Sequence, residues 1–137
     1  MLIFDTSIVL QILKNRDFYR DMREIVDEDV KITSITAYEL LRGAIFVRLT
    51  RHSDREMNVI MSLLSEISVL PFGSEESRIA SYIWAMLKEK GVSINDADIM
   101  ISSICIGAKE KLITLDRDFE KIKGVYEGFE VEILEMS

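Results

Sequence analysis

Short apolar runs alternate along this chain with segments in which apolar residues recur every three or four positions. The first pattern predicts buried strands, and the second predicts amphipathic helices packed against them. Residues 2–5 and 111–116 are two such runs, and each ends in an aspartate. The pattern predicts strands at 2–5, 30–34, 68–72, 111–116 and 129–134, and helices at 6–15, 16–29, 36–49, 54–67, 74–90, 95–109 and 118–123.

Polar residues that favour the first turn of a helix mark three of the helix starts. Thr36 and Glu39 have the spacing of a capping box, in which each side chain bonds to the backbone of the other. Ser74 and Asn95 are placed to cap the two helices that follow them. These residues therefore have a structural explanation before any chemistry is considered.

The order of the elements predicts an α/β fold, a three-layer sandwich in which helices flank both faces of a central, mostly parallel five-stranded sheet. The alternating apolar pattern of residues 129–134 suits an edge strand. In open parallel sheets, ligands bind beyond the carboxyl ends of the strands. We therefore expect the functional site at the edge where Asp5 and Asp116 end their strands.

The composition is that of an ordinary globular protein, with 137 residues, 48% hydrophobic and 30% charged. The absence of any low-complexity segment predicts a single domain over 1–137. No apolar run is long enough to cross a bilayer, and the first residues lack the basic segment of a signal peptide. Cys105, the only cysteine, cannot form an internal disulfide and is expected to be buried, so a cytoplasmic protein is the simplest interpretation.

Four acidic residues from separate segments are predicted to meet at the carboxyl edge of the sheet. Asp5 and Asp116 end strands, whereas Glu39 and Asp98 lie in first turns of helices that face the same edge. Clustered carboxylates repel one another unless a cation compensates, and Mg²⁺ and Mn²⁺ prefer oxygen ligands. His52 is the only histidine, which excludes a zinc site built from histidine and cysteine and most triad chemistry.

The net charge of −7 argues against a broad basic surface for nucleic acid. It does not argue against a nuclease, because carboxylates that hold metal ions count as negative charges. Each acid also has a structural explanation, as a helix cap, a first-turn acid or a turn residue. That explanation needs four independent coincidences at one edge, so a shared function is favoured.

Four segments carry motifs in a fixed order. "LIFDTSIVL" joins a strand to Asp-Thr-Ser, "ITSITAYELLRGA" places Glu-Leu after a threonine, "INDADIMISSICIGA" places an acid before a helix of small and apolar residues, and "LITLDRDFEKI" contains Thr-x-Asp-x-Asp-Phe. In this order and at these intervals they resemble the PIN-domain family, and more narrowly the VapC-type toxin ribonucleases. Ser102 and Ser103 stand where that family usually has alanines, and we interpret Ser102 as a packing residue bonded to a helix carbonyl.

The resemblance implies a PIN-like fold and a metal-dependent endoribonuclease that hydrolyses RNA phosphodiester bonds with Mg²⁺ or Mn²⁺. It implies that Asp5, Glu39, Asp98 and Asp116 are the catalytic residues and metal ligands. Asp96 is secondary, because residues two apart on a helix point about 200° apart and Asp98 is the better match. Asp118 is also secondary. Substrate contacts are expected from Thr6, Arg42 and Arg117.

The resemblance further implies an RNA substrate, a small antitoxin protein as partner, a homodimer and no membrane association. Segments 45–49 and 82–88 carry enough apolar residues to contact a partner, although Trp84 is expected to be in the core. Two alternatives stay open. The protein could be a non-catalytic PIN-like module that binds RNA or protein, or a PIN nuclease that processes RNA rather than a toxin.

Overall fold

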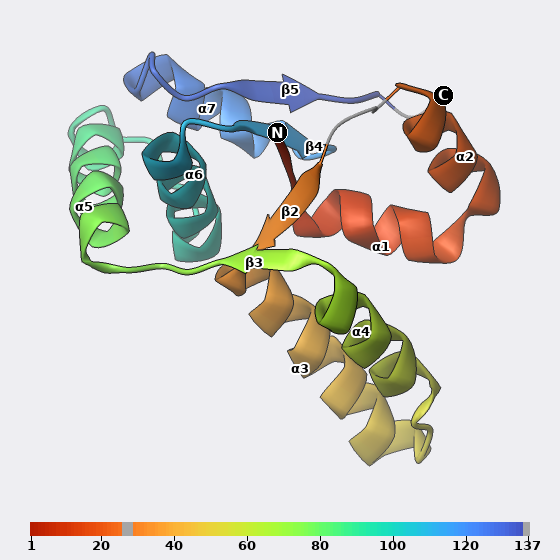
Figure 1. The fold of residues 1–137 in the computed structure, drawn as a ribbon. Helices are drawn as coiled ribbons and strands as arrows, with labels where there is room; N and C mark the ends of the chain where they lie inside the picture. The colour runs from red at the N-terminus through yellow and green to blue at the C-terminus, as the bar shows by residue number, and fades with distance from the viewer. Residues whose placement is uncertain (26–28, 136–137) are drawn as a thin grey trace.

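The computed structural model describes residues 1–25 and 29–135, and its centre is one parallel sheet (Figure 1). The strand order is β3-β2-β1-β4-β5, and every neighbouring pair is parallel. The predicted sheet is therefore confirmed, including the edge position of β5. The strands are β1 (Leu2–Phe4), β2 (Val30–Thr33), β3 (Ser68–Leu70), β4 (Lys111–Thr114) and β5 (Val131–Ile133).

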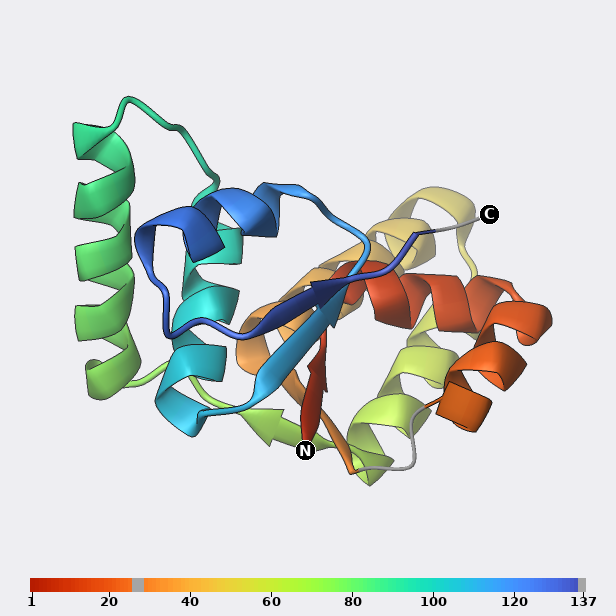
Figure 2. The same ribbon diagram turned by 90° about the horizontal axis from the view of Figure 1, so that it is seen from above.

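Helices cover both faces of the sheet, which confirms the three-layer prediction. Figures 1 and 2 show α1, α3 and α4 on one side, with α3 and α4 projecting as a hairpin, and α5, α6 and α7 on the other. The predicted helix 16–29 is confirmed over Arg16–Ile25, and residues 26–28 lie outside the described part of the chain. The helices are α1 (Thr6–Lys14), α2 (Arg16–Ile25), α3 (Ser34–Arg51), α4 (Arg55–Glu66), α5 (Ser74–Glu89), α6 (Asp96–Ala108) and α7 (Asp118–Val125).

The two layers of helices enclose two separate hydrophobic clusters, one on each face of the sheet. Successive side chains of a strand point to opposite faces. Leu2 and Phe4 of β1 accordingly join the cluster under α1, α3 and α4, whereas Ile3 joins the cluster under α5, α6 and α7. Cys105 is fully buried in the second cluster, as predicted. Burial on both faces holds β1 and β4 in place, and these strands lead to Asp5 and Asp116.

The predicted capping box between Thr36 and Glu39 is wrong. Helix α3 begins at Ser34, and the hydroxyl of Thr33 caps it by accepting a hydrogen bond of 3.1 Å from the Thr36 amide. Two threonines three residues apart offer the same local chemistry, and the structure uses the earlier one. Glu39 therefore takes no part in the cap, and it lies about one turn after Thr36 in α3.

Of the two other predicted helix caps, one is wrong and one is confirmed. Gly73, not Ser74, occupies the capping position of α5, where the Glu76 side chain reaches back 3.1 Å to accept from the Gly73 amide. Asn95 caps α6 as predicted, accepting a hydrogen bond of 2.9 Å from the Asp98 amide. The confirmed cap is the one that leads into the candidate site.

Trp84 is not a core residue, contrary to the prediction. Ile83 and Leu87 on the same helix are buried, but Trp84 is 50% exposed. Its position is about 100° around the helix from Ile83, at the border of the buried face. Within the described residues, no helix combines the length and the apolar content that crossing a membrane requires.

Candidate active site

The acids at the strand ends meet because β1 and β4 are neighbours in the sheet. Their parallel pairing places Phe4 beside Ile113, and the backbone amide of Asp5 donates to the Ile113 carbonyl at 3.0 Å. Asp5 follows immediately, and Asp116 lies two residues beyond the end of β4. The topology alone therefore brings these two acids to one edge.

The Asp5 carboxylate is buried and held by two hydroxyl groups. Thr114 Oγ1 donates to Asp5 Oδ2 at 2.7 Å, and Ser7 Oγ donates to the same oxygen at 2.9 Å. Burial raises the pKa of Asp5 above its ordinary value, hydrogen bonds from Thr114, Ser7 and the Thr6 backbone oppose this, and the Glu39 carboxylate adds to it. Although Asp5 precedes α1, its side chain makes no capping hydrogen bond, so the capping explanation fails.

Asp98 is the second buried carboxylate, only 9% exposed, in the first turn of α6. The Asn95 side chain that caps α6 also donates from Nδ2 to Asp98 Oδ2 at 2.9 Å. Burial raises the pKa of Asp98 to about 7; the Asn95 hydrogen bond opposes this, and the carboxylates of Asp5, Asp116 and Glu39 add to it. The four predicted acids therefore lie close enough to repel one another.

Glu39 is held at the mouth of the site by Thr6. The Thr6 hydroxyl donates to Glu39 Oε1 at 2.7 Å, and a guanidinium nitrogen of Arg42 lies 3.5 Å from Glu39 Oε2. Thr6 also lies 3.0 Å from the buried Thr36 hydroxyl, which fixes its side chain from below. Thr6 and Arg42, both predicted as substrate contacts, thus touch Glu39 in the structure.

Asp98, Asp116 and Asp118 form the tightest group of carboxylates among the described residues. One oxygen of each lies within 4.8 Å of the others. Asp116 Oδ1 accepts from the Asp118 amide at 2.9 Å, a contact within the turn that follows β4. Asp118, predicted as secondary, thus joins Asp98, whereas the exposed Asp96 lines a hollow between α5 and α6.

Two further predictions can be placed. Arg117 is engaged by two acids, Glu120 at 3.2 Å and Glu135 at 2.7 Å, and it follows Asp116 directly. Ser102 donates to the Asp98 carbonyl at 2.9 Å and is fully buried, which confirms it as a packing residue bonded to a helix carbonyl. Its hydroxyl therefore does not bond to the Asp98 carboxylate.

Comparison with known proteins agrees with this fold. Residues 2–125 match the PIN domain. The chain belongs to the PIN-domain family. Ribonuclease VapC3 of Methanocaldococcus jannaschii is 34% identical over 103 residues, which is 74% of this chain and 95% of that protein. The tRNA(fMet)-specific endonuclease VapC of Salmonella typhimurium is 25% identical over 126 residues, 90% of this chain and 92% of that protein.

Solved structures show the same PIN fold. DNA-bound VapBC from Salmonella typhimurium has a TM-score of 0.78 at 24% identity, with 96% of both chains covered. VapBC2 from Rickettsia felis, bound to a DNA fragment from its promoter, has a TM-score of 0.78 at 18% identity, with 98% of both chains covered. The predicted family and fold class are therefore confirmed.

The acids of this PIN domain suit a hard divalent cation. They supply only oxygen ligands, which Mg²⁺ and Mn²⁺ prefer. The raised pKa of Asp98 shows that the site without a cation disfavours the charged carboxylate, and a bound cation reverses that preference. Asp98, Asp116 and Asp118 are the residues that could contact one ion together, with Asp5 and Glu39 close by.

Ser7 is a site residue that the sequence analysis missed. Besides donating to Asp5, its Oγ accepts from the Leu115 amide at 3.1 Å and lies 3.4 Å from Thr114 Oγ1. It therefore ties the start of α1 to the end of β4. The signal was a hydroxyl residue two positions after Asp5, but such a residue at a helix start is usually explained by capping.

Asn95→Ala is expected to lower the free energy of unfolding by about 1 kcal/mol, because the cap of α6 is lost. It is also expected to weaken Mn²⁺ binding, because Asp98 loses the donor that orients it. Urea denaturation and calorimetry measure the two effects. Asn15→Ala is the matched control, because Asn15 caps α2 through the Asp17 amide at 2.9 Å, away from the acids. An equal loss of Mn²⁺ affinity in both variants would contradict the orienting role of Asn95.

Proposed function

We propose that this protein is a VapC-type endoribonuclease, the toxin of a toxin–antitoxin pair, and that it hydrolyses RNA with a divalent cation bound at the carboxyl edge of the sheet. The observation that carries the proposal is the convergence of Asp98, Asp116 and Asp118 within 4.8 Å. The matching relatives are named as ribonucleases and as a tRNA endonuclease, which supports RNA as the substrate.

The residues of the site divide into ligands and supports. Asp5, Asp98 and Asp116 would hold the ion, with Asp118 as an additional ligand. A divalent cation at this position supplies a water molecule of lowered pKa and neutralises charge on the phosphate. Thr114 and Ser7 fix the Asp5 carboxylate, and Asn95 fixes Asp98. These supports leave little freedom for the acids to separate when they are charged.

Glu39 is proposed to orient or deprotonate the attacking water. Its Oε1 is held by Thr6, so its carboxylate has a defined direction before substrate arrives. Arg42 contacts it only at 3.5 Å and is largely exposed, so the guanidinium can turn to a phosphate of the RNA. Thr6 and Arg42 are thus a positioning residue and a substrate contact in the proposed reaction.

The direct test is cleavage of a panel of structured RNAs by the purified protein without any partner. Cleavage is expected with Mg²⁺ or Mn²⁺ but not in EDTA. EDTA removes the cation that neutralises charge on the phosphate and lowers the pKa of the attacking water. Gel electrophoresis of end-labelled RNA gives the rate and the cut position. Folded protein that neither cleaves nor binds Mn²⁺ by calorimetry would favour a non-catalytic binding module instead.

A groove beside Glu39 is proposed to bind the antitoxin. It has a volume of about 620 Å³ and lies between α1, α3 and α4. Leu10, Leu13 and Val59 line it and are exposed, so the protein alone leaves apolar surface uncovered there. Its acidic end at Glu39 suits a partner segment that combines apolar side chains with a basic one. The proposed homodimer would use other surfaces.

Val59→Arg is expected to abolish co-purification with the antitoxin encoded by the neighbouring gene, because it places a charge in the apolar groove. Co-expression followed by affinity purification of a tagged antitoxin measures this. Val69→Arg, on the exposed β3 edge outside the groove, is the matched control and should leave the complex intact. Loss of the complex in the control alone would move the antitoxin from the groove to the β3 edge of the sheet.

A further inference from the structure

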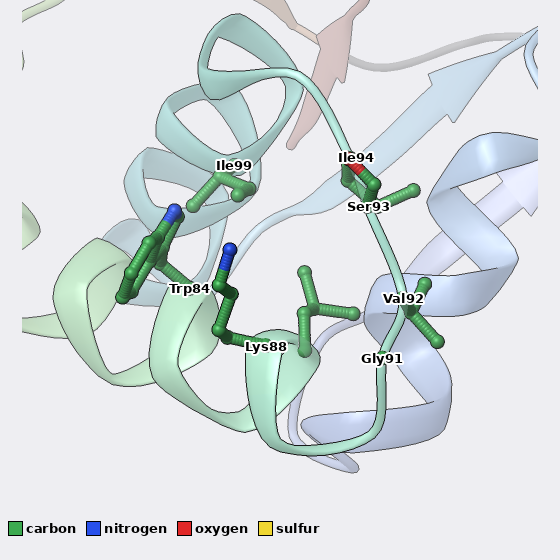
Figure 3. A pocket seen from close by; sticks show the side chains of 8 residues that line it. Trp84, Lys88, Gly91, Val92, Ser93, Ile94 and Ile99 are labelled. Atoms are coloured by element: carbon green, nitrogen blue, oxygen red, sulfur yellow. The ribbon is translucent and has the colours of Figure 1, made fainter.

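Trp84, the only tryptophan of the chain, stands half exposed beside a cation. Lys88 Nζ lies 5.7 Å from the centre of its ring. Figure 3 shows both side chains at a hollow whose other wall is the loop through Val92 and Ser93. The hollow has a volume of about 210 Å³, and Ile99 of α6 lies at its back. An exposed indole and a cation thus share one small concave surface.

This hollow borders the helix end that carries the catalytic acids. Its loop runs directly into the first turn of α6, where Asn95 caps the helix and orients Asp98. Ile99, which lines the hollow, is the residue after Asp98. The Trp84 hollow and Asp98 therefore lie at the same end of α6, where an RNA bound at Asp98 can extend to the hollow.

Lys88 is free to meet a phosphate, whereas each cation beside the acids has an acidic neighbour. Arg42 is paired with Glu39, Arg117 with two glutamates, and Lys121 with Asp118 at 3.4 Å. Lys88 forms no ion pair with any residue in the described ranges. Its ammonium group instead contacts the Trp84 ring. The other cation over an aromatic ring among the described residues is Arg42, 5.1 Å from the centre of the Tyr38 ring, and it also has Glu39 beside it.

We propose that this hollow is a subsite for one unpaired nucleotide of the RNA, whose base stacks on Trp84 and whose phosphate contacts Lys88. This inference rests on the proposed ribonuclease function. Stacking on a side chain requires a base that is not stacked in a duplex, which is how proteins recognise RNA loops and single strands. The enzyme therefore prefers cleavage positions that have an unpaired nucleotide nearby.

Tryptophan fluorescence tests the subsite directly, because Trp84 is the only tryptophan. Single-stranded oligoribonucleotides are titrated into Asp98→Asn protein, in which cleavage is blocked, and quenching reports stacking. The single strand should quench the emission, and a blunt duplex of the same sequence should not. In an anisotropy assay with labelled oligonucleotide, Trp84→Ala should weaken binding by about tenfold or more, the loss expected for one stacked base.

The lysine has its own signature, and Tyr82 provides the control. Lys88→Gln should make the slope of log affinity against log salt less negative by about 0.7, the value for one phosphate contact on a single strand. Tyr82→Ala removes an exposed aromatic on another side of the same helix and should leave binding and cleavage preference unchanged. Equal effects from Tyr82→Ala and Trp84→Ala would overturn the subsite.

The outcomes separate this inference from the proposed function. Metal-dependent cleavage without quenching, and with the same RNA preference in Trp84→Ala, overturns the subsite and leaves the ribonuclease. Quenching by RNA without cleavage keeps the subsite and overturns the ribonuclease. A Trp84 emission that changes with protein concentration alone, together with a smaller species for Trp84→Ala on size-exclusion chromatography, would assign the surface to a second copy of the chain and overturn the subsite.

Discussion

Asp98→Asn is expected to lower metal-dependent RNA cleavage at least about 100-fold without unfolding the protein. Asp98 has a carboxylate oxygen within 4.8 Å of those of Asp116 and Asp118, where the metal ion is proposed to bind, and it is repelled by Asp5 and Glu39. Loss of a residue that only supports a metal ligand typically costs 10–100-fold, so loss of a ligand should reach at least the upper end of that range. Single-turnover cleavage of one RNA under saturating Mg²⁺ measures the loss.

Asp96→Asn is the matched control for this experiment. It makes the same chemical change two residues earlier on α6, at an exposed position that lines the hollow between α5 and α6 and is not in the group of Asp98, Asp116 and Asp118. Its cleavage rate should stay within about threefold of the wild type, a change of less than 1 kcal/mol in the barrier. If Asp96→Asn were the inactive variant and Asp98→Asn the active one, the metal site would lie on the face of α6 that carries Asp96.

The positions of Asp5 and Asp116 could be predicted from the sequence because they depend on topology. Both acids follow short buried runs, and alternating strands and helices imply that such runs end at the same edge of a parallel sheet. The structure brings Asp5 and Asp116 there through the pairing of β1 with β4. The cap at Asn95 could also be predicted from the sequence, because it depends on a contact with a residue only three positions away.

The errors fall where two local solutions have nearly equal energies. Thr33 and Thr36 can both cap a helix, and the structure uses Thr33 because Thr36 packs beneath Thr6. That contact joins residues 30 positions apart, so no local pattern reveals it. Gly73 replaces Ser74 for a similar reason, since Glu76 can satisfy the backbone amide that an earlier cap leaves exposed.

Whether Asp118 belongs to the group of site carboxylates, and whether Trp84 is exposed, depend on how whole elements pack. Asp118 reaches Asp98 only because the turn after β4 begins α7 beside the first turn of α6, and the sequence shows neither placement. Trp84 lies at the border of the buried face of α5, where helical periodicity does not decide between core and surface. In both cases the chemistry was visible in the sequence and its location was not.

The free energy of unfolding of the metal-free protein is expected to include a contribution that falls as the pH rises from about 4 to about 7. Burial raises the pKa of Asp98 to about 7 in the folded state from an ordinary value of 3.8. Between these values the folded protein keeps the proton and the unfolded chain has lost it, so raising the pH favours unfolding. One pKa unit corresponds to about 1.4 kcal/mol, and with partial screening by solvent we expect about 2 kcal/mol from Asp98.

The difference between wild type and Asp98→Asn isolates the contribution of Asp98 and its coupling to the neighbouring acids, because titrating groups that do not interact with Asp98 affect both proteins alike. In urea denaturation with EDTA, Asp98→Asn should be more stable than the wild type at pH 7, and the difference should shrink toward pH 4. Asp96→Asn should follow the wild-type curve. Mn²⁺ added at pH 7 should stabilise the wild type by about 2.7 kcal/mol at 100 times its Kd, but Asp98→Asn much less. Parallel curves for wild type and Asp98→Asn would mean that Asp98 is charged in the metal-free fold, and the electrostatic argument for a cation among these carboxylates would lose its basis.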